Sequence, residues 1–108
     1  MELSLLIETC LQRLRPQNAD EDAAVGAMVR AEWLTRCLWK LEDDLFRQKM
    51  RELRPFHPDA GSRTLLALAF RSLSEEGGPL DEINACADRY ELDYLRGWRR
   101  LKQLRGKK

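Results

Sequence analysis

The placement of helix-breaking residues constrains this fold more than any other feature of the sequence. Breakers stand at Pro16, at Pro55 with Pro58, and at Gly77-Gly78-Pro79, and only Gly26 interrupts the long stretch between Pro16 and Pro55. Between these points apolar residues recur every three or four positions, and no segment alternates with the period of two that a half-buried strand needs. The sequence therefore predicts an all-α chain with four helices.

The first two helices are predicted on either side of Pro16. An apolar stripe with helical spacing precedes the proline and consists of Leu3, Leu6, Ile7, Cys10 and Leu14. Asn18, with Glu21 three residues later, is typical of a helix N-cap. The helix that follows is expected from about Ala19 to about Arg54, roughly 50 Å at 1.5 Å per residue. Its apolar residues are too broadly distributed for one stripe, so we expect other helices to cover it on two sides.

The last two helices are predicted on either side of the glycine pair. Ser62 is expected to cap the third helix, and Pro79 suits the first turn of the fourth. Gly97 lies on the apolar seam of that fourth helix, where glycine costs about 1 kcal/mol relative to alanine, so we expect another backbone to pass close to it. The helix-packing interface predicted along this seam comprises Leu80, Ile83, Ala87, Tyr90, Tyr94, Gly97 and Leu101.

These elements predict a four-helix bundle-like domain in which a long central second helix runs antiparallel to a long C-terminal fourth helix. The chain is 108 residues long and 44% hydrophobic, which is enough apolar material for one core. We therefore expect a single domain over residues 1–108, with fraying of the basic tail at about 103–108.

Charge and cysteine content exclude several classes of protein. The formal net charge is +1, so the chain as a whole points to no anionic partner. The chain has three cysteines, Cys10, Cys37 and Cys86, which form no CxxC pair, and it has only one histidine. This content argues against a metal site and against a disulfide framework. We therefore expect buried, reduced thiols. No cofactor and no membrane span are expected, and the absence of a signal-peptide pattern favours a cytoplasmic location.

Catalytic chemistry finds little support in the sequence. His57-Pro58-Asp59 resembles the signature of the J-domain co-chaperones, but the tyrosine patterns expected upstream are missing and Pro55 stands two residues before the histidine. We therefore favour a proline-bounded turn, in which two prolines end the long helix and Asp59 makes a local turn. The carboxylates of Glu42, Asp43 and Asp44 have no His, Cys or Ser partner at helical spacing. We therefore predict no catalytic residue, no small-molecule substrate and no enzymatic activity.

The C-terminal segment is the one asymmetric feature of the charge distribution. From Leu95 to Lys108 there are seven basic residues and no acidic one. These residues are the predicted nucleic-acid contacts: Arg96, Arg99, Arg100, Lys102, Arg105, Lys107 and Lys108. The same cations also suit the negative end of a helix dipole or pairing with acidic residues of the second helix, so both readings stay open.

Two stretches resemble an uncharacterised family of small bacterial all-helical proteins. One runs from Leu5 to Met50 and includes the segments Leu11 to Pro16 and Ala31 to Glu42; the other includes Arg89-Tyr90-Glu91, Tyr94, Arg99-Arg100-Leu101 and Leu104. Members of that family carry W-x-L-x-R-x-E and R-Y-E patterns. The resemblance implies an all-helical fold and brings no known activity with it.

The sequence thus favours a non-enzymatic helical module for protein–protein interaction or oligomerisation. The expected partner is a second copy or another protein, and a homodimer would bury about 1,200–2,000 Å². The alternative is a nucleic-acid-binding accessory protein that uses the basic C-terminal helix.

Overall fold

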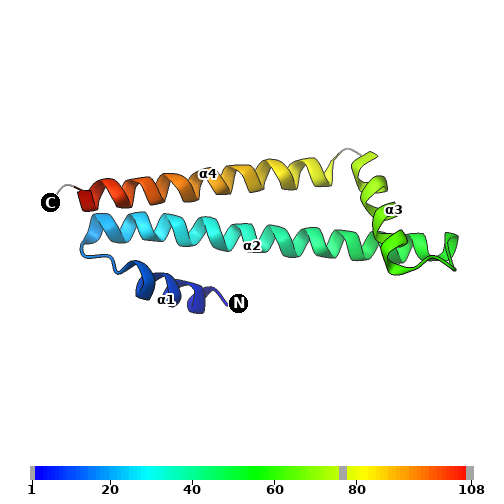
Figure 1. The fold of residues 1–108 in the computed structure, drawn as a ribbon, viewed down its shortest axis with the longest axis horizontal. Coiled ribbons are helices and arrows are strands. Elements are labelled where there is room, and N and C mark those ends of the chain that lie inside the picture. The colour runs from blue at the N-terminus through cyan, green and yellow to red at the C-terminus, as the bar shows by residue number, and fades with distance from the viewer. Residues whose placement is uncertain (1, 76–77, 107–108) are drawn as a thin grey trace. The chain divides into compact units, whose positions relative to one another are not determined.

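A computed structural model describes residues 2–75 and 78–106 of the chain (Figure 1). This part is all-α, as predicted, and contains four α-helices and no strand. The helices are α1 (Leu3–Leu14), α2 (Ala19–Leu53), α3 (Ser62–Glu75) and α4 (Pro79–Gly106), and a short 3-10 helix, η1 (Arg54–Phe56), follows α2. The long second helix and the long C-terminal helix contact each other, which confirms the predicted bundle-like fold.

Local sequence accounts for the ends of these helices. The side-chain oxygen of Asn18 accepts a hydrogen bond from the backbone N–H of Glu21 at 2.8 Å, and the Asn18 amide donates to the Glu21 carboxylate at 3.2 Å. This reciprocal pair confirms the predicted N-cap of α2. Arg15 ends α1 in the left-handed conformation with a φ of 46°, and its N–H donates to the Leu11 carbonyl at 2.9 Å.

The described residues divide into two compact units. Unit 1 joins the chain up to Arg36, which includes α1 and the first part of α2, to the part of α4 that begins at Ala87. Unit 2 runs from Cys37 to Cys86 and contains the rest of α2, η1, α3 and the start of α4. One domain over residues 1–108 stays a prediction.

The core of unit 1 combines residues from all three of its helices. Its buried members are Leu6, Cys10, Leu14, Ala24, Val25, Met28, Val29 and Leu101, and Trp33, Tyr94, Trp98 and Leu104 pack against them. Helices α2 and α4 approach each other closely at Gly97, where an added Cβ would lie 2.7 Å from Met28 Cγ and 3.1 Å from the Ala24 carbonyl oxygen. The two helices therefore touch where the sequence places a glycine on the seam.

An ion pair between partly exposed Arg105 and buried Glu21 ties the ends of α1, α2 and α4 together in unit 1. The Arg105 guanidinium lies 2.8 Å from the carboxylate of Glu21, whose side chain is 4% exposed. The same guanidinium donates to the backbone carbonyls of Leu14 and Arg15 at the end of α1. Arg105 therefore satisfies a buried carboxylate and two helix-terminal carbonyls at once.

Unit 2 is held by α3 packing against the distal part of α2. Leu65, Ala69 and Leu73 are the buried stripe of α3. The Phe70 ring of α3 stacks on Phe46 of α2, with ring centroids 6.1 Å apart. The buried residues of unit 2 are thus this stripe of α3 together with Leu80 and Ile83 at the start of α4.

The expectation that other helices cover α2 on two sides is wrong for its distal part. Trp39 is 63% exposed, and Leu41 and Cys37 are exposed as well. The buried residues of α2 all lie between Glu21 and Ala31. A residue of α2 is buried only where another helix packs against its turn. The apolar pattern of α2 alone does not show where that packing occurs.

Candidate interaction groove

An open groove runs between α2 and α4 within unit 1 and has a volume of about 810 Å³. The helices are antiparallel here, because the N-terminal end of α2 lies beside the C-terminal end of α4 (Figure 1). Its lining includes small residues of both helices, which we call the floor, together with the larger side chains of Leu34 and Tyr90. The floor residues are Ala23, Ala24, Ala27, Ala31 and Gly97. Along α2 the groove extends from Asp20 to Leu34, about 21 Å at 1.5 Å per residue.

The groove is open because its α2 residues are small and because α1 contacts another side of α2. Ala23, Ala27 and Ala31 follow one another at four-residue intervals, so their methyl groups share one side of α2. Glu32, which accepts a long hydrogen bond of 3.9 Å from the Cys10 thiol of α1, lies two residues and about 200° from Arg30. Helix α1 therefore contacts α2 on the side away from the groove.

Arginines dominate the rim. Arg30 comes from α2, and Arg89, Arg96 and Arg100 come from α4. Two carboxylates, Asp20 and Asp93, share the lining, so four cations and two anions leave a net charge of +2.

Most of these arginines have no carboxylate partner in the described part of the chain. Arg96 lies 3.9 Å from Asp93 in an exposed and long ion pair. Arg30, Arg89 and Arg100 form no ion pair with any described residue. Their side chains are exposed, so three guanidinium groups on this rim are available to an anionic group of a ligand.

The structure divides the predicted nucleic-acid contacts into different environments. Arg96 and Arg100 line the groove, whereas Arg99 and Lys102 are exposed and lie outside it. The Lys102 ammonium lies 5.4 Å from the centroid of the Trp98 ring. Arg105 is engaged inside unit 1 by Glu21. Lys107 and Lys108 lie outside the described residues.

The residues of the predicted helix-packing interface fall in both units. In unit 1, Gly97 and Leu101 are buried, and Ala87, Tyr90 and Tyr94 are half-buried. In unit 2, Leu80 and Ile83 are buried.

Two rim residues, Arg30 and Arg89, were missed by sequence reasoning. Arg89 precedes Arg96 by seven residues and Arg100 by eleven, which places all three on one side of a helix. The spacing of these arginines on α4 therefore predicts a shared face. The sequence around Arg30 gives no such indication, because only the packing of α2 against α4 brings Arg30 to the same groove.

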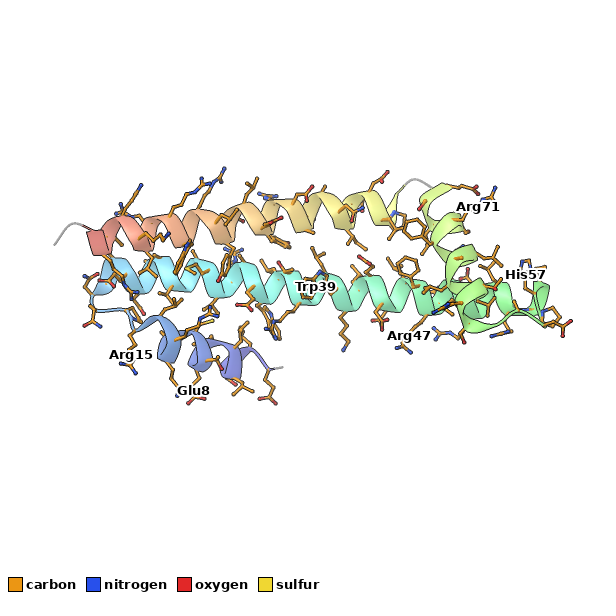
Figure 2. The ribbon with its side chains drawn as sticks, viewed as in Figure 1. Glu8, Arg15, Trp39, Arg47, His57 and Arg71 are labelled. Carbon is orange, nitrogen blue, oxygen red and sulfur yellow. The ribbon has the colours of Figure 1, made fainter. Side chains whose placement is uncertain are left out.

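The His57-Pro58-Asp59 tripeptide forms a turn between η1 and α3, and Figure 2 labels the exposed His57 there. The Arg54 carbonyl accepts from the His57 N–H, and the His57 carbonyl accepts from the Ala60 N–H, each at 3.1 Å. These bonds use backbone atoms, as a turn does. In the acidic cluster of α2, Asp43 and Asp44 are exposed and Glu42 is half-buried, and Asp43 pairs with Arg47 at 2.7 Å.

The three thiols lie in different environments: Cys10 is buried, Cys86 is half-buried and Cys37 is exposed. Burial, and next the neighbouring Glu32 carboxylate, raise the pKa of the Cys10 thiol. Among the described residues, no group of three or more His, Cys, Asp or Glu side chains is placed to hold a metal ion. No described helix is long and apolar enough to cross a membrane.

Comparison with protein-family models, curated proteins and solved structures gave no match. The resemblance to a family of small bacterial all-helical proteins therefore stays a prediction.

Proposed function

We propose that this protein is a non-enzymatic helical interaction module that binds a partner protein through the α2–α4 groove of unit 1. The proposal rests on the composition of the groove, whose lining combines four alanines and Gly97 with three arginines that form no ion pair with any described residue. An apolar floor with a polar rim is the usual anatomy of a protein-binding surface. Arginine is also enriched at the residues that contribute most to such interfaces.

Site-specific photo-crosslinking tests this proposal. A photoreactive benzoylphenylalanine replaces Asp20, at the end of the groove, in one variant and Asp22 in another. Both aspartates are exposed, lie in the first turn of α2 and carry the same charge, so only the position relative to the groove differs. We expect one protein adduct from position 20, suppressed by excess wild-type chain and absent from position 22. Identical adducts from both positions, or no protein adduct from position 20, would refute the proposal.

Nucleic-acid binding is the second candidate, because α4 ends in a run of exposed basic residues. Arg96, Arg99, Arg100 and Lys102 are all exposed, and no acidic residue interrupts α4 from Leu95 to its end. Contact with about three phosphates of duplex DNA would give a slope near three in a plot of log K against log salt concentration. An anisotropy titration that detects no DNA or RNA binding at about 50 mM salt would remove this candidate.

The expected homodimer and the expected cytoplasmic location remain predictions. A homodimer is compatible with the groove as a binding surface, because the exposed aromatic residues available for a dimer interface are not groove residues. These residues, Trp39, Phe56 and Phe70, belong to unit 2, whereas the groove belongs to unit 1.

A further inference from the structure

We infer that the groove binds an acidic amphipathic helix of a partner protein, which places small apolar side chains on the alanine floor and carboxylates against the arginine rim. This inference rests on the proposed function and specifies the chemistry of the partner.

The shape of the groove fits a helix. Its length along α2, about 21 Å, corresponds to about four turns. The exposed methyl groups of Ala23 and Ala27 allow another backbone to approach closely, because neither side chain extends beyond Cβ. Since α1 contacts α2 on its other side, a further helix in the groove would complete a bundle around α2 and α4.

The charges of the rim specify the polar face of that helix. The rim uses arginine four times and lysine nowhere, and a guanidinium binds a carboxylate through two parallel hydrogen bonds. Arg89, Arg96 and Arg100 extend over about 16 Å of α4, so carboxylates on successive turns of a docked helix can meet them. Phosphate would satisfy the same guanidinium groups, but it would leave the apolar floor exposed to water.

A second copy fits this groove less well. Two grooves facing each other would bring together two surfaces that each carry a net charge of +2. Like charges across an interface suppress association, so the occupant needs a net negative face.

A titration with designed peptides tests the inference on the full chain. The probe is a fluorescein-labelled helical peptide of about 16 residues, with alanine and leucine on one face and glutamate flanking that face. A second peptide has glutamine in place of glutamate. A third keeps every glutamate but has a central proline, which breaks the helix. We expect the first peptide to bind at about 50 mM salt and each of the others to bind at least 10-fold more weakly.

Two double variants with equal loss of charge locate the site. R96Q with R100Q removes two groove arginines, and R99Q with K102Q removes two exposed cations of α4 outside the groove. We expect the first pair to weaken binding of the acidic helix about 10-fold and the second pair to change it less than 2-fold. Ala27→Phe, which fills the floor at an exposed position without altering charge, should weaken binding as well. Urea unfolding of each variant checks that it is folded.

The outcomes separate this inference from the proposed function. Equally tight binding of the glutamine peptide, sensitive to Ala27→Phe, would overturn the acidic partner and leave the groove as a protein-binding site. Equal losses in both double variants would overturn the groove as the site. Failure of the acidic helix to bind at 100 μM would overturn the inference, whereas the crosslinking at position 20 decides the proposed function by itself. Tighter binding of an oligonucleotide, lost in R96Q with R100Q, would assign the rim to nucleic acid.

Discussion

Substituting Gly97 of α4 and Gly26 of α2 by alanine should change stability in opposite directions. At position 97 the new methyl would lie 2.7 Å from Met28 Cγ and 3.1 Å from the Ala24 carbonyl oxygen, whereas carbon atoms in ordinary contact are about 3.5–4.0 Å apart. A rotamer change of Met28 can relieve the first contact, but the second is with the backbone of α2, which must shift by a few tenths of an ångström to relieve it. Overpacking of this kind costs about 1–3 kcal/mol, and the gain in helix propensity returns about 1 kcal/mol. We therefore expect Gly97→Ala to lower the free energy of unfolding by about 1 kcal/mol.

Gly26→Ala is the matched control, because position 26 is an exposed helical glycine with no atom within 4 Å of an added Cβ. Only the gain in helix propensity applies there, so the free energy of unfolding should rise by about 1 kcal/mol. Urea unfolding measures both changes, and for a slope of about 2 kcal/mol per molar each corresponds to a midpoint shift of about 0.5 M. A higher midpoint for Gly97→Ala, similar to that of Gly26→Ala, would show that α4 does not approach α2 at this position.

Three further predictions concern stability, thiol chemistry and association. Arg105→Met should lower the free energy of unfolding by about 2–3 kcal/mol, because it leaves the buried Glu21 carboxylate without its cation; a loss below about 0.5 kcal/mol would contradict the ion pair. Exposed Cys37 should react with a thiol reagent in the native protein, whereas buried Cys10, with its raised pKa, should react only on unfolding; similar rates for the two would contradict their different environments. Light scattering at micromolar concentration should report twice the 12.6 kDa of one chain, and a species of 12.6 kDa alone would rule out the homodimer.

Sequence reasoning worked where the controlling signal is local. Pro16, Pro55 and Pro79 lie at the ends of the helices they were expected to delimit, and the Asn18 side chain makes the predicted cap hydrogen bond. The prediction for Ser62 is wrong by one position, because Ser62 is the first residue of α3 and the Gly61 carbonyl accepts from the Leu65 N–H. These features depend on a few neighbouring residues, whose chemistry is the same in any tertiary context.

Burial was harder to predict because it depends on distant parts of the chain. Trp39 belongs to the same apolar stretch as Ala31, yet it is 63% exposed while Ala31 is buried. For the groove, Arg96 and Arg100 were recognised as candidate contacts from local charge, but Arg30 joins them only through the register of α2 against α4. That register is set by the close approach at Gly97, which the sequence suggests without identifying the residues opposite.

An NMR titration tests whether the α2–α4 groove is the surface to which a partner binds. Amide resonances of isotope-labelled protein are followed as the acidic helical peptide is added. We expect the chemical-shift changes to concentrate in two segments of the groove, from Asp20 to Leu34 and from Arg89 to Arg100. Changes centred instead on α1, on α3 or on the exposed face around Trp39 would contradict it.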